Sequence, residues 1–205
     1  MERMSLWQIM VSGGPMMWPI FLCSVFAAVI VAERLFYLSR IKINPQEFLQ
    51  SILDKVKRHQ IKEALGFCDN THSPIAAIFK VGILKYDRPR SQIKEAMEDA
   101  SLYVLPQLDK NLVLLETIAH ISPLLGLLGT LLGMAKGIRL LSGNLTPNFP
   151  AGIFDATWQA FLATIFGLVV SITSFLAYSY LRLRIRAIIL EMDRLATEFL
   201  DFLTE

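Results

Sequence analysis

The chain has 205 residues, of which 54% are hydrophobic and 19% are charged, and its mean hydropathy is +0.47. This composition is too apolar for an ordinary soluble domain. The net charge of +2 is small, and no stripe of the sequence mixes basic with aromatic residues, so nothing predicts binding of nucleic acid.

Three long runs contain no aspartate, glutamate, lysine or arginine: residues 4–32, 117–135 and 156–181. About 20 apolar residues cross the hydrocarbon core as a helix, so each run predicts a transmembrane helix. The first run is longer than the apolar region of a cleaved signal peptide. The sequence therefore predicts an all-α integral membrane protein with three transmembrane helices that extend into the cytoplasm, and with a small helical cytoplasmic insert.

Lysine and arginine beside the spans predict the orientation. Residues 39–112 hold twelve of them and residues 182–205 hold four, whereas the link between the second and third runs offers only Lys136 and Arg139. We therefore expect the N-terminus on the outer side of the membrane and the C-terminus in the cytoplasm. The expected organisation is an outer-side N-terminus (1–14), transmembrane helix 1 (15–38), a cytoplasmic helical insert (39–112), transmembrane helix 2 (113–138), a short outer-side loop (139–153), transmembrane helix 3 (154–181) and a cytoplasmic helical extension (182–205).

The insert and the C-terminal extension both carry helical periodicity. Phe48, Ile52 and Val56 recur every four residues, which predicts the first of several short amphipathic helices in the insert. No helix breaker follows residue 181, and Ile185, Met192 and other apolar residues continue at helical spacing, so the third helix is expected to run well past the membrane.

Small residues punctuate the second and third runs. The stretch "PLLGLLGTLLGM" contains Gly126, Gly129 and Gly133, and Gly167 lies in the third run. Each glycine disfavours a helix by about 1 kcal/mol relative to alanine, so an anchor alone does not explain them. Small residues let membrane helices approach closely, and we interpret these four as helix-packing positions.

Polar side chains follow one face of the third run. Thr157, Thr164 and Ser171 are seven residues apart, and such a stripe fits a narrow polar path. The alternative is that each hydroxyl bonds the carbonyl four residues earlier in its own helix. Gln159 cannot satisfy its amide within its own helix, which favours an interior position.

Other ionisable residues near the spans have simple interpretations. Asp155 suits the dipole at the start of the third helix. Glu116 and His120 are four residues apart and fit either an interfacial pair or a protonation relay. These candidates fall on opposite sides of the membrane, so we expect no enzyme. No metal-ligand spacing or cofactor motif occurs, and we expect neither a metal nor a cofactor.

Four segments then resemble a known family in order: "GGPMMWPI", "ERLFYL", "IAHISPLLGLLGTLLGM" and "FDATWQAFLATIFGLVV". They resemble the three spans of the MotA/TolQ/ExbB proton-channel family, closest to its ExbB and TolQ branch. The resemblance implies a subunit of a motor driven by the proton-motive force in a bacterial inner membrane. It implies a homopentamer around a dimer of an ExbD/TolR-like protein, a single-span partner with an aspartate in its membrane helix.

The resemblance also implies site residues. The pore threonines of the family match Thr130 and Thr164, which would line the proton pathway together with Gln159, Thr157 and Ser171. The family often carries glutamate at the place of Gln159, and a glutamine cannot titrate. A non-conducting scaffold of the same architecture therefore stays open as an alternative, as does the stator of a gliding or secretion motor. Lys136 and Arg139 would face lipid headgroups, pair with Asp155 or set the field at the pore mouth.

Overall fold

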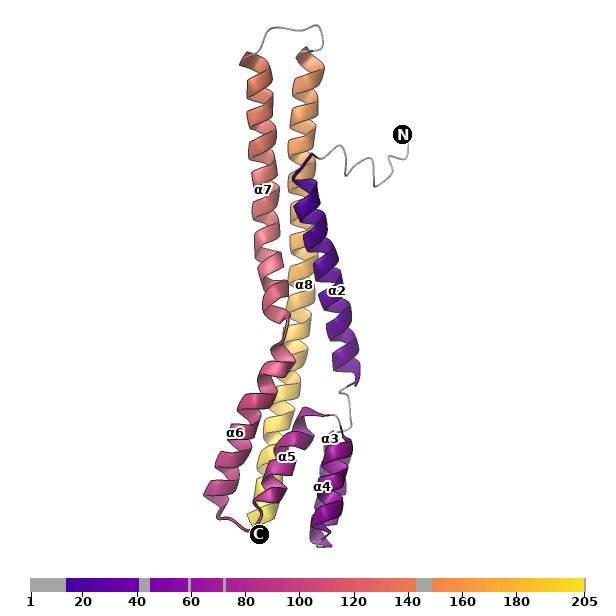
Figure 1. Ribbon diagram of the computed structural model, residues 1–205, viewed down its shortest axis with the longest axis vertical. Coiled ribbons are helices and arrows are strands. Elements are labelled where there is room, and N and C mark those ends of the chain that lie inside the picture. Colours follow the sequence, from indigo (N-terminus) through magenta and orange to yellow (C-terminus); the bar gives the residue numbers. More distant parts are fainter. Residues whose placement is uncertain (1–13, 41–44, 59, 72, 143–148, 205) are drawn as a thin grey trace. The chain divides into compact units, whose positions relative to one another are not determined.

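A computed structural model describes residues 14–40, 45–58, 60–71, 73–142 and 149–204 (Figure 1). Within these ranges the chain is helical between short turns, and no strand occurs, which confirms the predicted all-α fold. The predicted N-terminal segment up to residue 13 lies outside the described residues. The helices are α2 (Met17–Arg40), α3 (Pro45–Lys57), α4 (Ile61–Asn70), α5 (Pro74–Leu84), α6 (Arg90–Asp109), α7 (Leu112–Ser142) and α8 (Phe149–Thr204).

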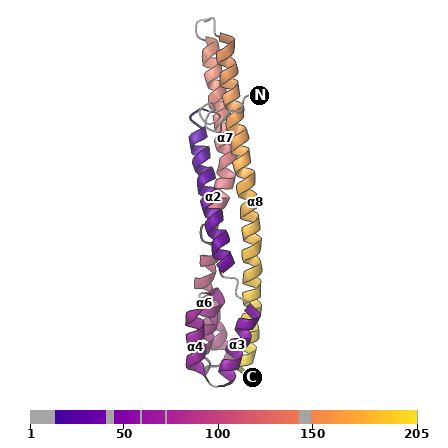
Figure 2. The same cartoon turned by 90° about the vertical axis from the view of Figure 1, so that its right-hand side faces the viewer.

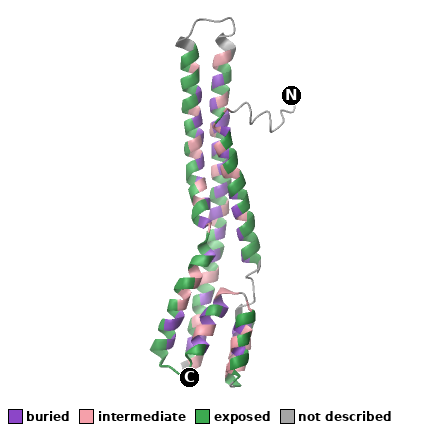
Figure 3. Ribbon diagram, in the orientation of Figure 1, coloured by how far each residue is buried: buried purple, intermediate pink, exposed green. Residues whose placement is uncertain are grey.

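Three helices are long and apolar enough to cross a membrane: Met17–Ser39, Leu112–Leu140 and Gly152–Leu203. Large apolar side chains on all three remain exposed, among them Phe26 in α2, Leu124 in α7 and Phe161 in α8. Figure 3 shows these exposed stretches along the outer sides of the helices. Such surfaces suit lipid as the surrounding solvent, and the three predicted transmembrane helices are confirmed as helices of sufficient length.

The chain divides into two compact units. The first combines the described residues up to Ala32 with Asn111–Ser179, and the second combines Glu33–Lys110 with the described residues from Tyr180 onward. In the first unit, α7 and α8 lie side by side in both Figure 1 and Figure 2. α7 ends at Ser142 and α8 begins at Phe149, so helical residues enter the predicted 139–153 link from both ends.

The second unit is a helical bundle with an aromatic core. The rings of Phe48 in α3 and Phe79 in α5 are stacked, with their centroids 6.0 Å apart. The ring of Phe79 also stacks on that of Phe199 in α8, with a centroid distance of 4.6 Å. Phe79 and Phe199 are fully buried. The predicted short helices of the insert are therefore present. They share one core with the C-terminal end of α8, and this contact was not predicted from the sequence.

Local sequence explains where several helices begin and continue. Pro45 and Pro74 stand at the first positions of α3 and α5, where the missing N–H needs no partner. Asn111 has φ of 64°, in the left-handed region that asparagine tolerates, and it separates α6 from α7. Pro123 lies inside α7, and the helix continues across it.

Candidate functional site

Small residues hold α7 against α8 at backbone distance. A Cβ added to Gly126 would lie 3.1 Å from the carbonyl oxygen of Ala163, and one added to Gly167 would lie 2.7 Å from the carbonyl oxygen of Ser122. A Cβ added to Gly133 would lie 2.7 Å from the Cβ of Ala160. These positions tolerate no side chain without moving a helix, as expected for small residues in a membrane helix pair.

Two hydroxyl groups of α8 cross this interface. Thr164 Oγ1 donates to the carbonyl oxygen of Gly126 at 3.2 Å and also lies 3.4 Å from the carbonyl oxygen of Ala160 in its own helix. Ser171 Oγ donates to the carbonyl oxygen of Ala119 at 2.7 Å. Both side chains are half-buried. The third hydroxyl of the stripe differs, because Thr157 is exposed and donates to Ile153 of its own helix at 2.9 Å.

Thr130 also bonds within its own helix. Its Oγ1 donates to the carbonyl oxygen of Leu127 at 2.6 Å, and the side chain is half-buried. The predicted bond of a hydroxyl to its own helix is therefore present at Thr130, Thr157 and Thr164. Ser171 and Thr164 also bond the neighbouring helix, a contact that was not predicted.

The α7 side of the pair has two distinct edges. Successive residues of a helix are turned by about 100° about its axis, so the order of angular position round α7 is Gly129, Gly133, Gly126 and Thr130. A Cβ at Gly129 would lie 3.5 Å from the Cβ of Met16, next to the start of α2. Thr130 therefore lies at the edge of the interface away from the start of α2.

The α8 side has the same arrangement. The order round α8 is Gln159, Ala163, Gly167, Thr164 and Thr157. A Cβ at Gly14 would lie 3.5 Å from Gln159 Oε1, so Gln159 marks the edge beside the start of α2. Thr130, Thr157 and Thr164 together form what we call the threonine edge, whereas Gln159 lies about 140° round α8 from Thr164.

Gln159 has a charged partner that sequence spacing did not reveal. Lys136 Nζ donates to Gln159 Oε1 at 3.3 Å, which joins α7 to α8 on the edge beside α2. Gln159 is half-buried and Lys136 is exposed. The two residues are 23 positions apart on antiparallel helices, and seven residues separate Lys136 from Gly129, which places both on one face of α7.

The remaining ionisable candidates are spread over α7 and α8. His120 Nδ1 lies 2.8 Å from the backbone carbonyl oxygen of Glu116, so the ring contacts the peptide group of that residue. Asp155 is exposed near the start of α8. Within the described part of the chain, no group of three or more histidine, cysteine, aspartate or glutamate residues is placed to hold a metal ion.

Two polar side chains are buried although the sequence did not predict it, and for Arg34, at the inner end of the first span, a cation that snorkels to the membrane interface was expected. Ser122 is fully buried, and its hydroxyl donates to the carbonyl oxygen of Ile118 at 2.7 Å. Its own carbonyl oxygen is the one that a Cβ at Gly167 would meet. Arg34 in α2 is 2% exposed and donates to the carbonyl oxygen of Gln107, in the last turn of α6, at 3.4 Å. A cation suits the carbonyl end of a helix, which gives Arg34 a structural role in the second unit.

The family model and the individual proteins that resemble this chain agree with one another. The family model described as the MotA/TolQ/ExbB proton channel family matches residues 70–194, more than half of the chain. Biopolymer transport protein exbB1 of Vibrio cholerae is 31% identical over 175 residues, covering 82% of this chain and 75% of that protein. An ExbB-like biopolymer transport protein of Synechocystis is 29% identical over 166 residues, covering 80% and 79%. The Tol-Pal system protein TolQ of Haemophilus influenzae is 29% identical over 137 residues, covering 62% and 60%.

Proposed function

Because the chain belongs to the MotA/TolQ/ExbB proton channel family, we propose that it forms an oligomeric channel wall that couples proton flow to work in the cell envelope. As a member of that family the chain is an energy-transducing membrane subunit, and the family is one of transport subunits rather than of enzymes. The assembly that we propose is a homopentamer around a dimer of an ExbD/TolR-like single-span protein. It resides in a bacterial inner membrane, with the N-terminus in the periplasm and the C-terminus in the cytoplasm.

The threonine edge is the observation that carries the proposal. Thr130 and Thr164 lie at the same edge of the α7–α8 pair, away from the start of α2. In the proposed assembly this edge faces the central partner. Their hydroxyl groups already have acceptors in the protein, and each oxygen keeps a lone pair for a partner or for water. A file of hydroxyls and waters avoids exposing a proton to hydrocarbon, which is costly.

The partner supplies the group that titrates. An aspartate in its membrane helix would exchange protons while the threonine edge orients water and accepts or donates hydrogen bonds. Ser171 extends the same path inward, and Thr157 extends it outward. The chain itself then acts as the wall, and its hydroxyls move protons without forming a covalent intermediate.

A flux measurement tests this assignment. Both proteins are reconstituted in liposomes under a pH gradient, and proton entry is followed with a trapped pH-sensitive dye. Thr164→Val keeps the shape of the side chain and should lower flux about tenfold, the effect of an unmade hydrogen bond of about 1.4 kcal/mol. Thr173→Val is the matched control, because the Thr173 hydroxyl bonds only carbonyl oxygens of its own helix on an exposed face. Equal flux in parent, Thr164→Val and control would refute the pore assignment.

The contact between Lys136 and Gln159 favours one alternative, a non-conducting scaffold of the same architecture. A neutral amide held by an ammonium offers no proton-accepting group at that position. Gln159→Glu places a titratable carboxylate there, with Lys136 as its partner. Absence of flux in the parent complex and in Gln159→Glu would support the scaffold, whereas flux in the parent complex would exclude it.

Co-purification tests the partner directly. The product of the adjacent gene is expected to be a single-span protein with an intramembrane aspartate. Expression of both, purification through a tag on one and mass measurement of the intact complex should give five copies of this chain with two of the partner. Isolation of this chain alone under the same conditions would contradict the proposed assembly.

A further inference from the structure

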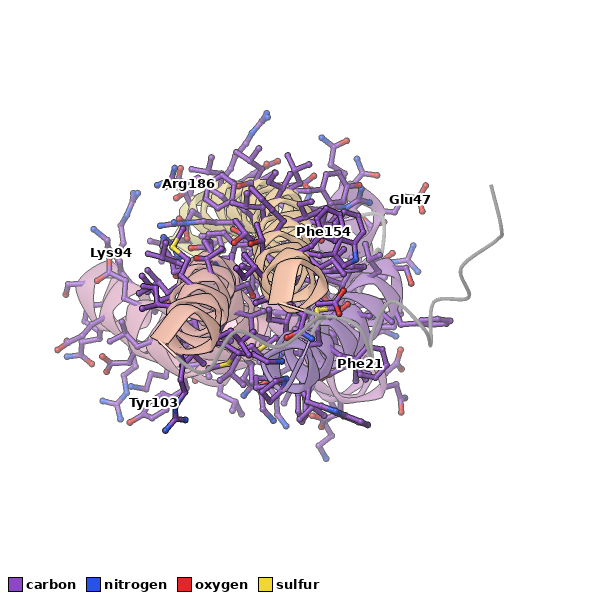
Figure 4. All side chains as sticks on the ribbon, turned by 90° about the horizontal axis from the view of Figure 1, so that it is seen from above. Phe21, Glu47, Lys94, Tyr103, Phe154 and Arg186 are labelled. Atoms are coloured by element: carbon purple, nitrogen blue, oxygen red, sulfur yellow. The ribbon has the colours of Figure 1, made fainter. Side chains whose placement is uncertain are left out.

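A cavity of about 640 Å³ lies on the first unit at the edge beside α2, where the α7–α8 pair continues past the start of that helix. Its lining comes from the last turns of α7 and the first turns of α8: Lys136, Leu140, Gly152, Phe154, Asp155, Trp158 and Gln159. Figure 4 labels Phe154, which α8 carries at this end of the pair. The uncharged runs of the two helices end at Ala135 and begin at Ala156, so the cavity lies at the level of the lipid headgroups.

The cavity presents one charge of each sign. The ammonium of Lys136 donates to Gln159 at 3.3 Å rather than to the carboxylate of Asp155, although both charged residues line the same space. A ligand that carries an anion and a cation on one small group satisfies both. The phosphoethanolamine headgroup has this composition: its phosphate suits Lys136, and its ammonium donates hydrogen bonds to Asp155.

An apolar strip leads inward from this cavity. Trp158, Ile165 and Val169 are seven and four residues apart, so they share one face of α8, and they are 44%, 53% and 51% exposed. An indole suits the boundary between headgroups and acyl chains. A charged cavity at the headgroup level that continues into an exposed apolar strip matches the shape of a phospholipid rather than of a free phosphoamine.

We propose that this cavity binds the headgroup of phosphatidylethanolamine, with the phosphate at Lys136, the ammonium at Asp155 and an acyl chain along the strip from Trp158. Lys136 and Gln159 lie on the edge of the α7–α8 pair opposite the threonine edge, and the strip from Trp158 follows the face of α8 about 100–140° round the helix from Thr164. The site therefore contains none of the residues of the threonine edge. Bound lipid would hold the pair where α2 no longer flanks it. The preference for ethanolamine arises at Asp155, because choline carries no N–H donor and glycerol carries no positive charge.

Lipid retention in nanodiscs tests the proposal. The protein is reconstituted with equal parts of phosphatidylethanolamine, phosphatidylcholine and phosphatidylglycerol, extracted with mild detergent and washed, and the retained lipids are quantified by mass spectrometry. The parent should enrich phosphatidylethanolamine about fivefold over each competitor, as expected of one partly exposed ion pair. Asp155→Asn should abolish the preference while phosphatidylglycerol is still retained, and Lys136→Met should reduce retention of both lipids.

Arg139→Met is the matched control, because Arg139 is a cation in the same part of α7 that does not line the cavity. It should leave the enrichment unchanged, and circular dichroism should show equal helix content in all variants. Equal retention of the three lipids by the parent would overturn the proposal. So would an unchanged preference in Asp155→Asn, or full displacement of the lipid by soluble phosphoethanolamine, since the apolar strip would then contribute nothing.

Discussion

Replacing Gly133 with alanine tests whether the contact between α7 and α8 depends on a missing side chain. The added Cβ would lie 2.7 Å from the Cβ of Ala160 and 2.9 Å from the carbonyl oxygen of Ala156. Neither neighbour can rotate away, because a carbonyl oxygen belongs to the backbone and a Cβ is fixed to it. The helices must therefore shift apart, and overpacking of this kind costs about 1–3 kcal/mol.

Gly137 supplies an internal reference. It lies one turn further along α7, and a Cβ there would lie 3.8 Å from the Cβ of Ala156, an ordinary van der Waals contact. Both substitutions gain about 1 kcal/mol of helix propensity, since each replaces glycine by alanine within the same helix. The difference in unfolding free energy between Gly133→Ala and Gly137→Ala therefore isolates the overpacking cost of about 1–3 kcal/mol.

Unfolding by sodium dodecyl sulfate in mixed micelles, followed by circular dichroism and by tryptophan fluorescence, measures that difference. Gly137→Ala should be at least as stable as the parent, and Gly133→Ala should be less stable than Gly137→Ala. Adding Ala160→Gly to Gly133→Ala removes the Cβ–Cβ contact and should recover part of the loss, because the contact with Ala156 remains. A difference below about 0.5 kcal/mol between the two single variants would refute the reasoning.

Two further predictions concern a hydroxyl group and a thiol. Ser171→Ala removes the hydrogen bond to Ala119 in α7 and should lower the free energy of unfolding by about 0.6 kcal/mol in the same assay. Thr173→Val removes only a bond within its own helix and should leave that free energy nearly unchanged. Equal effects of the two substitutions would contradict the interhelical role of Ser171. Burial, with the charge of Asp69, raises the pKa of the Cys68 thiol from 9.0 to about 11. Folding therefore disfavours the thiolate, so the contribution of the thiol to stability is intact below about pH 9 and is lost as the pH rises toward 11. The parent should lose stability over this interval relative to Cys68→Ala, and parallel pH profiles of the two would contradict the raised pKa.

Much of the fold was predictable because its signals are local. Runs without charge identify α2, α7 and α8, and periodic apolar residues identify the helices of the insert. The shared core of the second unit was not predictable in this way. Phe79 and Phe199 are 120 residues apart, and nothing in the periodicity of either segment names the other as its partner.

In the candidate site, too, the local features were predictable from the sequence and the contacts between helices were not. Small residues at Gly126, Gly133 and Gly167 predicted close packing, and the distances agree. The partners of polar side chains depend on how two antiparallel helices align, which a single sequence does not reveal. Spacing of seven therefore grouped Thr157 with Thr164, although only Thr164 reaches α7, and it gave no indication that Lys136 lies against Gln159.

The glycines also explain why the polar residues fall on two edges. At the centre of the α7–α8 contact the backbones lie too close for a large side chain, so the longer polar side chains of these helices lie at its margins and only the small Ser122 is buried among the described polar residues of α7. One margin carries the uncharged hydroxyls of Thr130 and Thr164, and the other carries Lys136 with Gln159. A fixed ammonium repels a passing proton, whereas neutral hydroxyls can relay one. Close packing therefore does more than join two helices: it keeps the charged margin apart from the margin that we propose faces the partner.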